Sequence, residues 1–163
     1  MTPITAAEHQ FHVVAWWASG RTGFARSNSA PHAIHFSAPP ALGGVEERWT
    51  AEDLLLCAIA SSYTTTFRTI AENAKFEYTD LQVEVDANLR DAQAGYEFGE
   101  IRISVVLTIA REQKREPALR LMQKAHDVCL VFRALAVAQK FESHVQVGKP
   151  NAEVGPILRV ACD

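Results

Sequence analysis

Apolar and polar residues alternate with a period of two in several stretches of the chain. In the first of them, Phe11, Val13, Ala15 and Trp17 occupy every second position, as expected of a strand with one buried face. The two longest stretches alternate strictly and are joined by a segment that contains two glycines, so they predict an antiparallel hairpin. The predicted strands are residues 11–17, 24–26, 33–36, 81–89, 101–109 and 144–147.

A long helix is predicted after Thr50. Thr50 and Asp53 have the spacing of a capping box, in which each side chain accepts a hydrogen bond from the other residue's N–H. The run 54–74 contains neither glycine nor proline, and apolar residues appear all round the predicted cylinder. This pattern indicates a central helix that is buried on most sides. The residues that share one face include Leu55, Ile59, Ser62, Thr66 and Ile70.

A second helical region is predicted from Pro117, a residue that fits the first turn of a helix, to about residue 137, with a break near 125–127. The order of strands, long helix, strands, helices and strand indicates an α+β fold. We expect one domain over residues 1–147. Residues 148–163 contain two prolines and two glycines without periodicity, and we expect them to form a C-terminal extension.

The composition is that of an ordinary globular protein, with 48% hydrophobic and 21% charged residues. A net charge of −3 without a long block of either sign argues against nucleic-acid and membrane partners, because both require clustered positive charge. No run of about 18 apolar residues and no secretory signal pattern is found in the sequence. Three widely spaced cysteines make a poor disulfide framework and favour a cytoplasmic location.

Three combinations of polar residues have a simple structural interpretation. His32 and His35 lie in a predicted loop or strand whose geometry does not place both rings on one face, and zinc needs further ligands. His126 and Cys129 share a helical face, but two ligands do not make a metal site. The hydroxyls at 61–66 fit hydrogen bonds to carbonyls one turn earlier, and the Gly-x-Ser-x-Gly elbow of a serine hydrolase is missing. These patterns predict neither a metal nor a cofactor.

Three segments, in this order, resemble the family of osmotically inducible protein C and organic hydroperoxide resistance protein (OsmC/Ohr). The first is the Gly-Arg-Thr-Gly turn at 20–23 after an N-terminal strand. The second is Ala-Glu-Asp-Leu-Leu-Leu-Cys-Ala-Ile-Ala-Ser-Ser-Tyr at 51–63, which is similar to the family's Pro-Glu-x-Leu-Leu-x-Ala-Ala-x-Ala-x-Cys-Phe. The third is Ala-His-Asp-Val-Cys at 125–129, which is similar to Ala-His-x-x-Cys-Pro.

The resemblance implies an intertwined homodimer in which antiparallel sheets wrap around long central helices, with sites at the subunit interface. Active members of the family are thiol peroxidases of the oxidative stress response, related in chemistry to peroxiredoxins. A peroxidatic cysteine in the central helix attacks the O–O bond of a hydroperoxide, becomes a sulfenic acid and then forms a disulfide with a resolving cysteine. An arginine and a glutamate form an ion pair that keeps the thiolate ready, because a nearby cation favours the charged form.

The resemblance assigns candidate roles to four residues of this chain. By position, Arg21 and Glu52 match the family's ion pair, and Cys129 matches the resolving cysteine. Ser62 holds the peroxidatic position, ten residues after Glu52. A hydroxyl forms neither a sulfenic acid nor a disulfide with Cys129. Leu130 also replaces the usual proline.

The other two cysteines fit the peroxidatic role less well. Cys57 precedes Ser62 by five residues, so it is rotated by about 140° and displaced by about 7.5 Å along the helix. A small packed side chain is therefore favoured over a relocated peroxidatic thiol. Cys162 lies in the extension and receives no role.

Three classes of function remain open. The first is an OsmC-like dimer with lost or altered peroxidase activity and a retained interfacial pocket for a small amphipathic molecule, such as a hydroperoxide or a fatty-acid-like ligand. The second is a one-cysteine thiol peroxidase that uses Cys129 to reduce organic hydroperoxides. The third is a dimeric interaction protein whose extension docks a partner. The apolar residues expected to line the pocket are Leu55, Ile59, Phe67, Trp49 and Phe132.

Overall fold

A computed structural model describes residues 10–93 and 95–148 of the 163-residue chain. The mixture of sheets and helices, in the predicted order, confirms the α+β fold class. The division into a domain over 1–147 and an extension over 148–163 remains a prediction, because nearly all of the extension lies outside the described residues.

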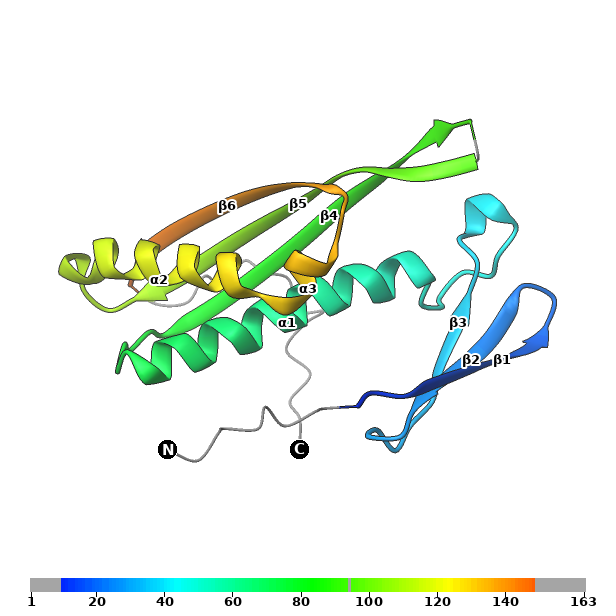
Figure 1. Ribbon diagram of the computed structural model, residues 1–163, viewed down its shortest axis with the longest axis horizontal. Coiled ribbons are helices and arrows are strands. Elements are labelled where there is room, and N and C mark those ends of the chain that lie inside the picture. Colours follow the sequence, from blue (N-terminus) through cyan, green and yellow to red (C-terminus); the bar gives the residue numbers. More distant parts are fainter. Residues whose placement is uncertain (1–9, 94, 149–163) are drawn as a thin grey trace, which may run out of the picture. The chain divides into compact units, whose positions relative to one another are not determined.

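The chain divides into two compact units, Met1–Leu55 and Leu56–Asp163. The boundary falls inside the long helix α1 (Ala51–Asn73), which therefore contributes its first turn to the first unit and its remaining turns to the second (Figure 1).

The first unit contains a three-stranded antiparallel sheet of β1 (Val13–Ser19), β2 (Thr22–Ser27) and β3 (Ile34–Ser37), in that order. A tight turn joins β1 to β2, and Gly20 in this turn has a φ of 51°, which glycine adopts at no steric cost. A single 3-10 turn, η1 (Pro40–Leu42), follows β3. The three predicted strands are confirmed, with bounds that differ by one or two residues.

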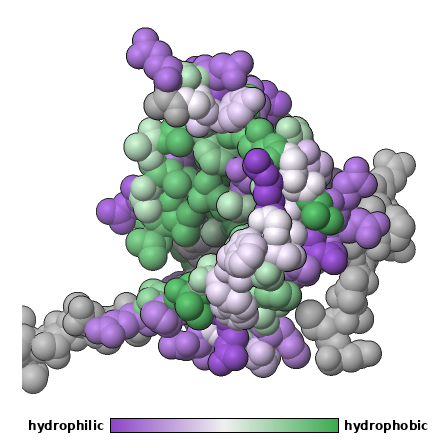
Figure 2. All heavy atoms as spheres, turned by 90° about the vertical axis from the view of Figure 1, so that its right-hand side faces the viewer, coloured by the Kyte–Doolittle hydropathy of each residue, from purple (hydrophilic) through white to green (hydrophobic). Residues whose placement is uncertain are grey.

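Large apolar side chains of this sheet remain at the surface. Phe11, just before β1, is 88% exposed, and Trp17 is 73% exposed. The ring of Trp16 stacks on Phe24 at 5.8 Å between centroids, and Phe24 stacks on His35 at 4.4 Å, across neighbouring strands. Figure 2 shows apolar residues at the surface beside hydrophilic ones on one side of the molecule. The β1–β3 sheet therefore exposes several large apolar side chains rather than a single isolated one.

The second unit contains a sheet of β4 (Asp80–Ala92), β5 (Gly95–Ile109) and β6 (Ala138–Val147), in that order (Figure 1). β4 and β5 form the predicted antiparallel hairpin, with an irregularity between Ala87 and Leu89. β6 pairs with β5 in parallel, which differs from the antiparallel pairing that the resemblance implies. A parallel neighbour requires a crossover connection, and the helices between β5 and β6 supply it.

The crossover contains η2 (Glu112–Lys114), α2 (Arg115–Val128) and α3 (Leu130–Ala134). Figure 1 shows α2 beside α1 on the same face of the sheet. The core lies between these helices and the sheet, and each fully buried large apolar side chain contributes roughly 1.5–3 kcal/mol. The residues with 0% exposure include Ile59, Tyr63, Phe67, Ile101, Ile103, Val105, Leu107, Ile109 and Met122.

Both ends of α1 have well-defined caps. Thr50 Oγ1 accepts from the N–H of Asp53 at 3.0 Å, and Asp53 Oδ2 accepts from the N–H of Thr50 at 2.9 Å, which confirms the capping box. At the other end, Lys75 has a φ of 51°, and the N–H of Phe76 donates to the carbonyl of Ala71 at 2.8 Å. This is the geometry of a Schellman motif, in which glycine is the usual residue at the position of Lys75.

The expectation that α1 is buried on most sides is wrong for a single copy of the chain. Its fully buried residues form one stripe, Ile59, Tyr63, Phe67 and Ala71. The sides of the helix away from this stripe reach the surface. The exposed residues include Cys57, Ala58, Ser61, Thr64 and Thr65.

The second helical region differs from the prediction in its break and its end. The break occurs at Cys129, where ψ is 121°, rather than near 125–127. The helical region ends at Ala134 and β6 begins at Ala138, because ladder pairing with β5 continues over the whole of that segment. In the part of the chain that the structure describes, no helix is both long and apolar enough to cross a membrane.

Candidate functional site

The first unit contains a pocket of about 590 Å³, formed by the sheet, the loop around η1 and the first turn of α1. Among the described residues that line it, only Arg21 and Glu52 carry a charge. An apolar wall with a few polar groups is typical of sites for small molecules. The larger apolar residues of the wall are Trp16, Trp17, Phe36, Pro39 and Leu42.

Arg21 is held at this pocket by the loop around η1. Its Nη1 donates to the carbonyl of Leu42 at 2.6 Å, and its own carbonyl accepts from the N–H of Ala38 at 3.0 Å. Gly43 has a φ of 79°, and a Cβ at this position would lie 3.5 Å from Arg21 Nε. The turn thus fits glycine and lets the guanidinium lie against it. A guanidinium has five N–H donors, so Arg21 retains donors for an acceptor in the pocket.

Glu52 is the second residue of α1 and lines the same pocket. Its Oε2 is buried and has no hydrogen-bond partner among the described residues. The helix dipole favours a carboxylate in the first turn, but an unpartnered buried acceptor costs about 1–3 kcal/mol. The ion pairs within 4.0 Å that the described residues form do not include Arg21 with Glu52. Both side chains therefore reach one pocket without forming the ion pair that the resemblance implies.

Ser62 and Cys129 meet in the second unit. Ser62 Oγ lies 3.2 Å from Cys129 Sγ, and either atom can be the donor. Cys129 stands between α2 and α3, where its extended backbone turns the chain, and it is 0% exposed. The structure therefore brings these two candidate residues into direct contact.

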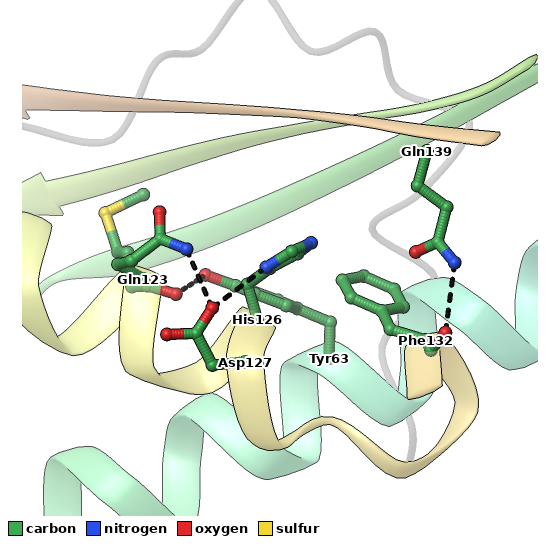
Figure 3. Close-up of polar contacts among 7 residues, drawn as sticks. Tyr63, Gln123, His126, Asp127, Phe132 and Gln139 are labelled. Atoms are coloured by element: carbon green, nitrogen blue, oxygen red, sulfur yellow. Dashed lines mark hydrogen bonds and ion pairs between the residues drawn. The ribbon is translucent and has the colours of Figure 1, made fainter. Parts of the chain in front are cut away.

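Tyr63, the residue after Ser62, is the centre of the aromatic cluster around this contact. Its hydroxyl donates to the carbonyl of Met122 at 3.1 Å, and its ring lies 5.8 Å from that of Phe132 (Figure 3). Burial raises the pKa of Tyr63 far above its usual value, and the nearby Cys129 adds to the rise. Tyr63 is thus a neutral hydrogen-bond donor that fixes α1 to α2.

His126 packs in the same cluster. Its ring stacks on Phe141 at 4.4 Å. Its Nδ1 lies 3.3 Å from Asp127 Oδ1 (Figure 3). Gln123 Nε2 donates to the same carboxylate oxygen at 2.9 Å. The hydrogen bond from Gln123, and after it the one with His126, hold the pKa of Asp127 below its usual range. His126 is therefore a packed and oriented histidine.

The remaining candidate residues belong neither to the pocket of the first unit nor to the aromatic cluster around Ser62 and Cys129. Cys57 is exposed on α1, and Cys162 lies outside the described residues. Around His32, His35 and the other described residues, no group of three or more His, Cys, Asp or Glu side chains could hold a metal ion.

The apolar residues expected to line a pocket lie elsewhere. Ile59 and Phe67 are 0% exposed, and Phe132 is 4% exposed, because all three pack in the core of the second unit. Leu55 and Trp49 do not line the pocket of the first unit either.

Comparison with known families shows which family of proteins the chain belongs to. A family model described as OsmC-like protein matches residues 44–144, more than half of the chain. The chain belongs to the OsmC-like protein family. The matched range of this OsmC-like chain includes Glu52, Ser62 and Cys129, and Arg21 precedes it.

Individual relatives extend the similarity over most of the OsmC-like chain. It is 28% identical over 147 residues to the uncharacterized protein YmaD of Bacillus subtilis strain 168, covering 87% of this chain and 98% of that protein. An organic hydroperoxide resistance protein from Elizabethkingia anophelis is similar in structure, with a TM-score of 0.70, 18% identity, and coverage of 87% and 99% of the two chains. An OsmC-like protein of unknown function from Vibrio cholerae gives a TM-score of 0.72, 14% identity, and coverage of 83% and 99%. These solved structures confirm the OsmC/Ohr fold.

The apolar wall of the pocket was not predicted from the sequence. Trp17, Phe36 and Leu42 come from two strands and a loop, and periodicity does not show which loop folds over a sheet. One signal was available, because Pro39-Pro40 and Gly43-Gly44 frame this loop. A Cβ at Gly44 would collide with the carbonyl oxygen of Ala38, so the loop closes on itself only with glycine there.

Proposed function

We propose that this OsmC-like protein binds a small amphipathic ligand and has lost the two-cysteine peroxidase chemistry of its family. The proposal rests on one contact, the 3.2 Å distance between Ser62 Oγ and Cys129 Sγ. The residue that touches the candidate resolving thiol carries a hydroxyl.

Two-cysteine chemistry needs two thiols in contact. The first attacks the O–O bond, releases an alcohol and becomes a sulfenic acid, and the second then displaces water to close a disulfide. Ser62 carries no sulfur, and an unactivated hydroxyl is a weak nucleophile. Cys129 is 0% exposed, which disfavours the alternative that it reduces hydroperoxides as the single working cysteine, because reactive cysteines are partly exposed.

A gain-of-function variant tests this proposal. We expect Ser62→Cys to consume an organic hydroperoxide in the presence of a dithiol, whereas the wild type does not. The matched control is Ser61→Cys, which introduces the same thiol one position earlier on the exposed side of α1, where Ser61 Oγ donates to the carbonyl of Ala58 at 3.3 Å. Equal turnover by both variants, or by the wild type, would contradict the proposal.

The pocket of the first unit supports the ligand-binding half of the proposal. It combines an apolar wall with the guanidinium of Arg21 and the carboxylate of Glu52, which suits a molecule with an apolar body and a polar head. Native mass spectrometry of the protein after incubation with a lipid extract should show a bound small molecule. A ligand-free spectrum after this incubation would count against binding.

We further propose that the protein is a homodimer whose second copy covers the apolar surface of the β1–β3 sheet and places the pocket at an interface. Trp17 is 73% exposed and Val13 64% exposed, and large exposed apolar patches mark interaction sites. The exposed side of α1 supports the same proposal. Sedimentation should give twice the chain mass of 18.0 kDa, and a monomer at micromolar concentration would contradict it.

A further inference from the structure

The head group of the ligand can be deduced from the charged groups of the pocket, and this deduction rests on the function proposed above. Glu52 lines the pocket with a carboxylate whose Oε2 has no hydrogen-bond partner among the described residues. The last torsion of a glutamate is soft, so either carboxylate oxygen can turn toward the pocket. A carboxylate accepts hydrogen bonds only. A hydrogen-bond donor on the ligand therefore suits this point.

Arg21, in contrast, favours a hydrogen-bond acceptor on the ligand. One N–H of its guanidinium is bonded to the carbonyl of Leu42, and its other donors can bind an acceptor on a ligand in the pocket. The first N–H groups of α1, at Ala51 and Glu52, also have no acceptor within the helix, and both residues line the pocket. A ligand that carries an acceptor close to its donor therefore matches both sides of this pocket.

The charges of the pocket disfavour an ionic head group. Arg21 and Glu52 are the only charged residues among the described residues that line it, so this lining carries no net charge. A carboxylate ligand would bring a second anion beside Glu52, and an ammonium ligand would bring a second cation beside Arg21. Glu52 and Asp53 already supply the negative charge that the start of α1 favours.

We propose that the pocket selects a neutral amphipathic amide, whose N–H donates to Glu52 and whose carbonyl accepts from Arg21 or from the first N–H groups of α1. The apolar chain of such a molecule lies against the wall formed by Trp17, Phe36 and Leu42. The amide matches both charged groups without adding a charge, and it leaves neither the donor nor the acceptor unpaired.

Three probes with the same chain length test this assignment: octanamide, octanoate and octylamine. Isothermal titration calorimetry of the full chain should show octanamide binding at least about tenfold more tightly than the two ionic probes, because octanoate adds an anion beside Glu52 and octylamine adds a cation beside Arg21. Quenching of tryptophan fluorescence gives a second readout, since Trp16 and Trp17 line the pocket.

The variant Glu52→Gln tests the role of the carboxylate. Its side chain offers a donor as well as an acceptor, so octanoate should bind about tenfold more tightly than it does to the wild type. Glu46→Gln is the matched control, because it removes the same charge in the same unit at an exposed residue that does not line the pocket, and it should leave all three affinities unchanged.

The possible outcomes separate this inference from the proposal on which it rests. Tighter binding of octanoate or octylamine by the wild type would overturn the amide assignment and leave ligand binding in place. An unchanged octanoate affinity in Glu52→Gln would also overturn it. Binding of none of the three probes to any variant would overturn both.

Discussion

The contact between Ser62 and Cys129 predicts that a disulfide forms between these positions once the serine is replaced by cysteine. The two residues lie 67 positions apart in the chain, and their side-chain heteroatoms are 3.2 Å apart. Cross-linking a loop of this length removes conformational entropy from the unfolded chain and stabilises the folded state by about 4 kcal/mol. For a chain of this size, such a gain raises the melting temperature by on the order of 10 °C.

The assay compares oxidised and reduced Ser62→Cys at equal protein concentration. One equivalent of an organic hydroperoxide should oxidise the introduced thiol to a sulfenic acid with release of the alcohol, and Cys129 should then displace water to close the bond. Intact and peptide mass spectrometry identifies the linkage, and denaturant unfolding with and without a phosphine reductant gives the stability difference. Ser61→Cys should show neither the linkage nor the gain. A linkage to Cys57 or Cys162, or an oxidised form no more stable than the reduced one, would contradict the contact between positions 62 and 129.

Three further predictions concern other parts of the structure. Lys75→Gly should raise the free energy of unfolding by about 1 kcal/mol, because it removes a side chain from a left-handed position; equal or lower stability in a urea titration would contradict this. Tyr63→Phe should lower the free energy of unfolding by about 1 kcal/mol, because the variant loses the buried hydrogen bond from α1 to α2. A variant as stable as the wild type would contradict this role of the Tyr63 hydroxyl. The hydrogen bonds from Gln123 and His126 lower the pKa of Asp127. They therefore stabilise the folded state at pH values above the ordinary carboxyl pKa, and this stabilisation is lost as the pH falls. The stability difference between the wild type and Asp127→Asn should therefore shrink below about pH 4, and a difference that grows there would be the wrong sign.

The fold could be predicted from the sequence wherever local chemistry decides the structure. The capping box at Thr50 and Asp53 fixes the start of α1, and strict alternation identifies β4 and β5. Non-local pairing was harder to predict. Most of β6 was missed, because its pattern has no strict alternation and its conformation depends on parallel pairing with β5.

The candidate site was predictable only in part for the same reason. The resemblance to the OsmC/Ohr family led to Ser62 and Cys129, and the structure brings them into contact. It also led to Arg21 and Glu52, which share a pocket without an ion pair. The carbonyl that accepts from Arg21 belongs to Leu42, and no local pattern indicates such a contact between a side chain and a distant loop.

The most direct test of the account is the steady-state consumption of an organic hydroperoxide by the wild-type protein with a dithiol reductant. The wild type should give a rate equal to that of the reductant alone, and Cys129→Ser should give the same rate, because the position that touches Cys129 carries no thiol. Turnover by the wild type that disappears in Cys129→Ser would contradict the account and would identify Cys129 as a working peroxidatic cysteine.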